Sequence, residues 1–187
     1  MTTDDSGKGA DLWVMAPMVA TVEEATYFTT LAREHGIRSA GVMVEIPAAA
    51  LMADRLLTQT DFVSVGTNDL TQYAMAADRV LGSVAAYQDP WHPAVLKLVG
   101  EVGSAGRSLG KPVGICGEAA ADPLLALVLV GLGATSLSMA PAAMAGVRTL
   151  LAKHTLAQAR ASAAAALAAS DADKARTAAR AALAPAS

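Results

Sequence analysis

Five short apolar runs, each followed by a longer segment with a helical pattern, constrain the fold of this chain more than any other feature. The runs are Leu12–Ala16, Ala40–Val44, Asp61–Val65, Pro112–Cys116 and Thr135–Ser138. Each run ends in residue types that are common in loops. Strands that alternate with helices are typical of βαβ units, in which the strands lie parallel in one sheet. The sequence therefore predicts an α/β fold of five parallel (β/α) units.

The helical segments have recognisable start and stop signals. We expect helices over residues 22–35, 48–58, 70–77, 93–109, 122–132 and 141–153. Asp122–Pro123 combines an N-cap residue with a Pro at the first helical position, and Gly110 is a residue type that ends helices. Residues 78–91 show little periodicity and are predicted to form a long loop, which in a compact α/β domain is usually functional.

Composition divides the chain into three expected regions. Residues 1–11 are polar and predict a disordered leader, and residues 12–155 hold the α/β units. Residues 156–187 are dominated by Ala, which has a high helix propensity, so one or two helices are expected there.

Charge, hydropathy and cysteine content exclude several classes of protein. The net charge is −3 and the isoelectric point is about 5.5, which argues against a nucleic-acid partner. No apolar run approaches the length of about 20 residues that a membrane span needs. One cysteine cannot form an internal disulfide, so a reducing cytoplasm is the expected compartment.

Polar side chains follow three consecutive predicted strands at the points where the strands end. They are Glu45, the turn Gly66–Asp69, and Cys116. Ligands of parallel α/β folds bind outside the carboxyl ends of the strands. The three strand ends therefore predict one site at this edge of the sheet.

Glu45 and Asp69 are candidate ligands of Mg²⁺. Neighbouring strands lie about 4.8 Å apart, so carboxylates at adjacent strand ends can share a hard cation that also binds substrate oxygens and water. For each residue alone there is a simpler interpretation. Glu45 would be a carboxylate favoured by the N-terminus of the next helix, and Asp69 would be a helix cap.

The turn after the third strand is suited to a phosphate group. Gly66 allows close approach of the backbone, and Asn68 adds a side-chain amide. Arg79 would add a guanidinium, although a single Arg is more often a solvated surface charge.

Cys116 leaves more alternatives open. An isolated free Cys is usually a small buried hydrophobe. At a strand end it would instead act as a nucleophile or as a general acid, and its position does not choose between the two.

Four motifs occur in order: Val44–Ala50, Gly66–Tyr73, Asp78–Arg79 and Gly114–Glu118. Together they resemble the phosphoenolpyruvate (PEP)-binding domain of Enzyme I, the PEP–protein phosphotransferase of the bacterial sugar phosphotransferase system. The resemblance covers about residues 12–170 and implies a TIM-barrel fold. The closest alternative is the related barrel of pyruvate phosphate dikinase or PEP synthase.

The resemblance implies roles for the candidate residues. Glu45 and Asp69 would be Mg²⁺ ligands, Asn68, Asp69 and Arg79 would bind the substrate, and Cys116 would be the acid that protonates the enolate carbon of pyruvate. In the family, PEP phosphorylates a histidine on a separate domain, which passes the phosphoryl group to the small carrier HPr and so drives sugar transport.

The chain also departs from the family. A TIM barrel has eight strands, and the five predicted here resemble the fourth to the eighth. We therefore expect residues 12–155 to form part of a PEP-binding barrel, with part of the site and no turnover alone. It would associate with a second copy or with the remaining barrel half. The alternative from another class is a non-catalytic interaction or dimerisation fragment.

Overall fold

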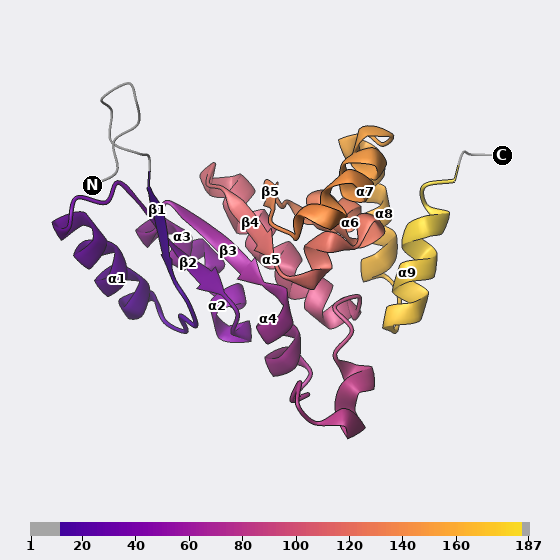
Figure 1. The fold of residues 1–187 in the computed structure, drawn as a ribbon, viewed down its shortest axis with the longest axis horizontal. Coiled ribbons are helices and arrows are strands. Elements are labelled where there is room, and N and C mark those ends of the chain that lie inside the picture. Colours follow the sequence, from indigo (N-terminus) through magenta and orange to yellow (C-terminus); the bar gives the residue numbers. More distant parts are fainter. Residues whose placement is uncertain (1–11, 185–187) are drawn as a thin grey trace.

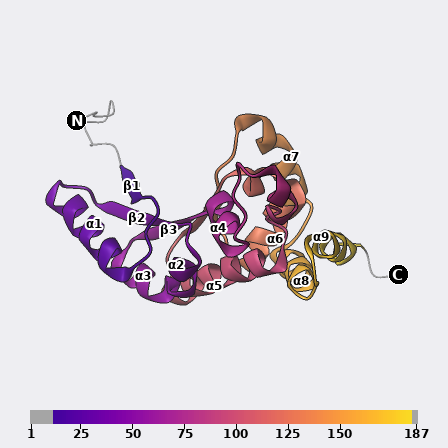
Figure 2. The ribbon, with the colours of Figure 1, turned by 90° about the horizontal axis from the view of Figure 1, so that it is seen from below.

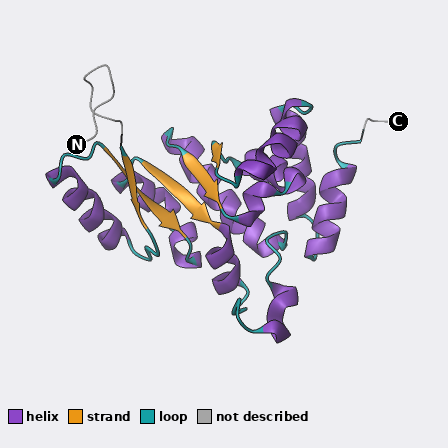
Figure 3. Cartoon of the chain, viewed as in Figure 1, coloured by secondary structure: helices purple, strands orange, loops and turns teal. Residues whose placement is uncertain are grey.

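The strands of the computed structural model, which describes residues 12–184, form one parallel sheet (Figure 3). They are β1 (Trp13–Ala16), β2 (Ser39–Val44), β3 (Phe62–Gly66), β4 (Val113–Cys116) and β5 (Ser136–Leu137). Their spatial order is the order along the chain, and each neighbouring pair is parallel. The predicted fold of five parallel (β/α) units is confirmed for the described part of the chain. The predicted leader, residues 1–11, lies outside that part.

Helices precede, connect and follow the later strands, and Figure 2 shows α1, α2, α3 and α5 along one side of the curved sheet. They are α1 (Val22–Glu34), α2 (Pro47–Leu51), α3 (Ala53–Gln59), α4 (Thr67–Ala74), α5 (Pro93–Leu109), α6 (Pro123–Leu132) and α7 (Pro141–Ala152). Figure 1 shows α1 at one end of the molecule and α7 near the other. The predicted segment 48–58 is divided into α2 and α3 at Met52, whose φ of −105° and ψ of 18° interrupt the helix.

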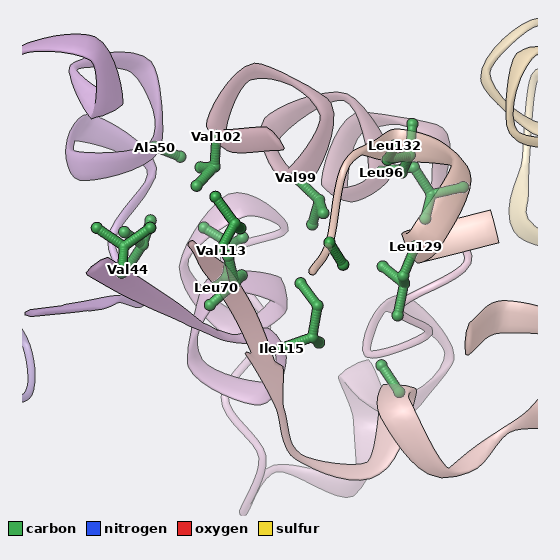
Figure 4. Close-up of a cluster of buried hydrophobic side chains, with 14 of the residues drawn as sticks. Val44, Ala50, Leu70, Leu96, Val99, Val102, Val113, Ile115, Leu129 and Leu132 are labelled. Atoms are coloured by element: carbon green, nitrogen blue, oxygen red, sulfur yellow. The ribbon is translucent and has the colours of Figure 1, made fainter. Parts of the chain in front are cut away.

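The core lies between the helices and alternate residues of the strands. Val113 and Ile115 of β4 pack in one buried cluster with Val99 and Val102 of α5 (Figure 4). Because side chains alternate between the two faces of a strand, Gly114 and Cys116 lie on the opposite face. This alternation separates the packing residues of each strand from those that can reach a ligand.

Small residues occupy the opposite face at several positions. A Cβ added at Gly41 would lie 2.6 Å from the carbonyl oxygen of Phe62, and one added at Gly114 would lie 3.2 Å from the Oγ of Ser136. At the β1 edge of the described sheet, the rings of Trp13 and Phe62 pack at a centroid distance of 4.7 Å, and Trp13 is 51% exposed. The face opposite to the helices therefore has little room for larger side chains at Gly41 and Gly114, and the sheet is exposed at its β1 edge.

The predicted helix signals act as expected. Asp122 is the N-cap of α6, and its side chain accepts hydrogen bonds from the backbone N–H groups of Leu124 and Leu125. Gly110 ends α5 in the left-handed conformation, with a φ of 64°. The long segment 78–91 contains a short 3₁₀ helix, η1 (Gly82–Tyr87), which the sequence pattern did not indicate.

The Ala-rich segment forms a pair of helices after α7. They are α8 (Leu156–Leu167) and α9 (Ala172–Ala181), and both pack on α6. Ala175 and Ala179 of α9 are fully buried. None of the helices in residues 12–184 is long and apolar enough to cross a membrane.

Candidate functional site

Three neighbouring strand ends lie at one level of the sheet. Val44 pairs with Val65, and Gly66 pairs with Cys116, so the residues that follow β2 and end β3 and β4 are lateral neighbours. Glu45, Gly66 and Cys116 therefore form one continuous edge. This is the arrangement predicted from the strand ends.

Glu45 is 5% exposed and reaches across this edge. Its Oε2 accepts a hydrogen bond of 2.8 Å from the backbone N–H of Met18, which follows β1. Its side chain also covers Gly66, where an added Cβ would lie 2.7 Å from Oε1. The next helix, α2, begins with Ile46 as N-cap, so Glu45 precedes that N-cap and makes no capping hydrogen bond to α2.

The carboxylate of Glu45 has no positive partner in the part of the chain that the structure describes. Within residues 12–184 no Lys, Arg or His side chain forms an ion pair with it. A mostly buried carboxylate without a counter-charge is energetically costly, and a bound cation would remove that cost.

Asp69 is in the first turn of α4, which begins at Thr67, three residues earlier than predicted. The N-cap of α4 is Gly66, so the interpretation of Asp69 as a helix cap is wrong. Instead, the carboxylate of Asp69 forms an ion pair with Arg79. The Nε of Arg79 also donates a 3.0 Å hydrogen bond to Oε1 of Gln72.

Arg79 is therefore held at the candidate site, although its side chain is 46% exposed. It comes from the segment 78–91, and its partners Asp69 and Gln72 both belong to α4. The exposed part of the guanidinium can bind an anion while Asp69 and Gln72 fix its position.

Asn68 lies next to the end of β4. Gly117 has a φ of 93°, and a Cβ added there would lie 3.3 Å from Oδ1 of Asn68 and 3.0 Å from Oγ1 of Thr67. Thr67 Oγ1 donates a 3.2 Å hydrogen bond to the carbonyl oxygen of Cys116. Thr67 was missed as a site residue, although its place at a strand-to-helix turn between Gly66 and Asn68 could have indicated it.

Cys116 is only partly buried. Its thiol donates a 3.2 Å hydrogen bond to the carbonyl oxygen of Val65 on β3. It lies on the face opposite to Ile115, which packs in the core. The simple interpretation of Cys116 as a core hydrophobe therefore does not apply.

The donor set at this edge fits a hard cation. Glu45 and Asp69 supply carboxylate oxygens, which Mg²⁺ prefers, and Mg²⁺ commonly takes one or two carboxylates together with substrate oxygens and water. In the described part of the chain no group of three or more His, Cys, Asp or Glu residues could hold a metal ion by itself. A metal at this edge would therefore need ligands from a substrate or from water.

Comparison with known proteins identifies relatives. Residues 5–156 match the sequence profile of a family described as PEP-utilising enzyme, PEP-binding domain. The chain is 57% identical over 173 residues to a phosphoenolpyruvate-protein phosphotransferase of Streptomyces coelicolor. The aligned residues make up 92% of this chain and 31% of that protein. A phosphoenolpyruvate synthase of Pyrococcus furiosus is 42% identical over 150 residues, covering 77% of the chain and 18% of the relative.

The chain thus spans about a third or less of the length of these relatives. The fold resembles a crystal structure of a citrate lyase from Burkholderia xenovorans, with a TM-score of 0.53, 16% identity, and coverage of 91% of this chain and 62% of that one. At this identity the likeness concerns the fold alone.

The order of the motifs, the parallel sheet and the sequence match agree, and the predicted resemblance is confirmed. The chain belongs to the family of PEP-utilising enzymes, and residues 5–156 correspond to its PEP-binding domain.

Proposed function

We propose that this chain takes part in phosphoryl transfer from PEP to a protein histidine, with release of pyruvate. The observation that carries the proposal is the buried carboxylate of Glu45, which has no counter-charge among residues 12–184 and shares one edge of the sheet with Asp69, Arg79 and Cys116. The similarity to a phosphotransferase at 57% identity favours a histidine acceptor over the reaction of the more distant PEP synthase.

Glu45 and Asp69 would hold Mg²⁺ in this proposal. When bound, Mg²⁺ supplies positive charge that offsets the charge of the phosphate and carboxylate oxygens of PEP. Arg79 and Asn68 would orient the phosphate by hydrogen bonds, and the hydrogen bond from Arg79 to Gln72 would keep the guanidinium in place while Asp69 binds the metal.

Cys116 would act on the other end of the substrate. After the phosphoryl group leaves, the enolate of pyruvate needs a proton at its terminal carbon. The thiol of Cys116 would donate this proton, and the thiolate would recover one from water. The hydrogen bond to the carbonyl oxygen of Val65 holds the thiol at the edge until then.

The partners follow from the same proposal. A phosphohistidine domain would accept the phosphoryl group and pass it to HPr in the cytoplasm. The exposed residues Trp13 and Met15 at the edge strand β1 support association with further strands, supplied by a second copy or by the rest of a barrel. The chain alone would bind PEP weakly and would not complete the transfer.

Calorimetry with the purified chain tests the proposal. PEP should bind in the presence of Mg²⁺ and lose affinity when Mg²⁺ is removed by a chelator. Asp69→Asn should weaken this binding, whereas Asp54→Asn, which changes an exposed carboxylate on α3, should not. A folded chain that binds PEP equally with and without Mg²⁺, or not at all, would contradict the proposal.

A further inference from the structure

Arg176 of the C-terminal helix α9 contacts the long segment 78–91. Its Nη2 forms an ion pair with Oδ2 of Asp89 at 3.0 Å, and its Nη1 pairs with Asp173 at 3.2 Å. The guanidinium carbon lies 5.4 Å from the ring centroid of Trp91, within the range of a cation–π contact. Arg176 thus contacts Asp89 and Trp91, at the end of the segment 78–91. Arg79 lies near the start of the same segment.

Trp91 continues this connection into the sheet. It is 1% exposed, and its backbone N–H donates to Oδ1 of Asp89 at 3.0 Å. Its Nε1 donates a 3.1 Å hydrogen bond to Oδ2 of Asp122. The other oxygen of Asp122 caps α6 by accepting from the N–H groups of Leu124 and Leu125. Asp89 and Asp122 therefore each use one carboxylate oxygen for Trp91 and the other for a second contact.

One end of the connection reaches Arg79. The segment 78–91 is closed at its base, because Nε2 of Gln88 donates a 2.6 Å hydrogen bond to the carbonyl oxygen of Asp78. Asp89, which binds Arg176, follows Gln88, and Arg79 follows Asp78. The position of Arg79 beside Asp69 therefore depends on where the end of this segment is fixed.

The other end reaches Cys116. Asp122 follows η2 (Glu118–Ala121), a single 3₁₀ turn that comes directly after Cys116 and Gly117. Ala119 and Ala120 of η2 are buried, so η2 has little freedom to move without its neighbours. The hydrogen bond from Trp91 to Asp122 fixes the far end of this turn.

We propose that Arg176 is a positioning residue for the candidate site. By binding Asp89 and covering Trp91, α9 holds the segment that carries Arg79 and the turn that follows Cys116 in one fixed arrangement. The inference deepens the proposed function, since it assigns the C-terminal helices a role in the same site. Arg176 also lies beyond residues 5–156, which match the PEP-binding domain.

The remaining contacts of α9 allow Arg176 to be changed without removing the helix. Ala175 and Ala179 are fully buried, and the Oγ of Ser162 on α8 donates a 2.9 Å hydrogen bond to the carbonyl oxygen of Ala179. Asp171 caps the start of α9 by accepting from the N–H of Lys174. These contacts do not involve Arg176.

The test compares Arg176→Ala with Arg180→Ala in the full chain. Both changes remove one Arg from α9, but Arg180 is exposed and in the last turn of the helix. Cys116 is the only cysteine, so the rate of alkylation by iodoacetamide reports on the site without any ligand. Amide hydrogen exchange over residues 78–91 and 117–125 reports on both ends of the connection.

We expect Arg176→Ala to speed exchange in both segments by about fivefold, because it removes the partly exposed ion pair with Asp89 and the cation–π contact with Trp91. Alkylation of Cys116 should rise by about threefold, and PEP affinity should fall. Arg176→Lys should restore part of each effect, because it keeps the ion pair with Asp89 but not the planar contact with Trp91. Arg180→Ala should leave all three measurements close to those of the unchanged chain.

Equal alkylation rates in Arg176→Ala and Arg180→Ala, or faster exchange confined to α9, would overturn the proposal. An unchanged chain that binds no PEP would instead contradict the proposed function. In that case the alkylation and exchange rates still decide whether Arg176 positions this edge of the sheet.

Discussion

The side chain of Glu45 lies directly over Gly66, on the neighbouring strand. A Cβ added at Gly66 would come within 2.6 Å of Cγ and 2.7 Å of Oε1 of Glu45, which is too close for any real side chain. The absence of a side chain at position 66 is therefore a condition for the position of the Glu45 carboxylate.

Gly66→Ala should displace Glu45 and abolish its proposed role. Since the new methyl group has no free space, we expect a loss of about 1–3 kcal/mol of unfolding free energy, typical of overpacking in a dense region. PEP affinity in the presence of Mg²⁺ should fall by about tenfold or more, because a metal ligand would move. Denaturant unfolding and calorimetry measure the two effects.

Gly82→Ala is the matched control, because a Cβ at Gly82 meets nothing within 4 Å. It should change neither stability nor binding. Full PEP affinity in Gly66→Ala would show that the position of Glu45 does not matter for binding.

In the proposed site, Arg79 and Mg²⁺ would compete for the carboxylate of Asp69. The guanidinium of Arg79 forms an ion pair with Asp69. Arg79→Gln should therefore raise the affinity for Mg²⁺ in the absence of substrate, by about twofold to fivefold for a pair this exposed. The same variant should weaken binding of PEP, because the charged hydrogen bonds to phosphate are lost. Mn²⁺ titration followed by electron paramagnetic resonance measures the expected rise in metal affinity. Calorimetry measures the expected fall in PEP affinity.

Arg55→Gln removes a charge elsewhere on the surface and serves as the control for net charge. A lower affinity for the metal in Arg79→Gln would contradict the prediction. It would mean that Arg79 and the cation do not compete for Asp69.

The fold could be predicted from the sequence because its signals are local. The alternation of strands and helices, the N-cap at Asp122 and the left-handed Gly110 each depend on a few neighbouring residues. The side that faces the helices then follows for the central strands β2, β3 and β4, because their Val and Ile residues pack in the core. The break at Met52 and the helix η1 escaped prediction, since neither has a strong local signal.

The candidate site could be predicted only where it coincides with strand ends. Glu45 and Cys116 were found in this way, and Asn68, Asp69 and Arg79 came from the turn and from the resemblance. Their roles in binding metal and substrate remain predictions. The link from Arg176 to Asp89 joins residues 87 positions apart, and no periodicity or motif indicates such a pair.

Asp61 gives the stability a dependence on pH. Partial burial raises the pKa of Asp61, but the hydrogen bond from the N–H of Ala40 and the Arg33 guanidinium outweigh it and hold the pKa below its ordinary value of 3.8. A carboxyl group with a lowered pKa stabilises the fold above its ordinary pKa, and the contribution is lost as the pH falls through the folded-state value.

Asp61→Asn should therefore lower the unfolding free energy at neutral pH, by at most about 1 kcal/mol because the ion pair is partly exposed. The difference from the unchanged chain should shrink as the pH falls below 3.8 and should disappear once the pH is below the lowered pKa of Asp61 in the folded state. Urea unfolding at several pH values measures it, with Asp54→Asn as the control. A difference in unfolding free energy that persists at low pH would mean that the charge of the Asp61 carboxylate is not the source of its stabilising effect.

Cys116 should be needed for proton transfer but not for binding. In the presence of Mg²⁺ and pyruvate, the thiolate would remove a proton from the methyl group to give the thiol and the enolate. The thiol would exchange its hydrogen for deuterium from D₂O and then return a deuteron to the enolate carbon, so the methyl signal in proton NMR should decay. Cys116→Ala removes the acid and should slow this exchange by about 10²–10⁴-fold, the usual contribution of a positioned acid or base. Cys116→Ser should be nearly as slow, because a hydroxyl is a much weaker acid than a thiol. PEP affinity should stay within about twofold in both variants, since the thiol contributes no charge to the phosphate site.

Exchange that continues at the original rate in Cys116→Ala would contradict this role and assign the proton to another group at this edge. The nearest carboxyl group in the sequence is that of Glu118, which is exposed and lies two residues further along the chain.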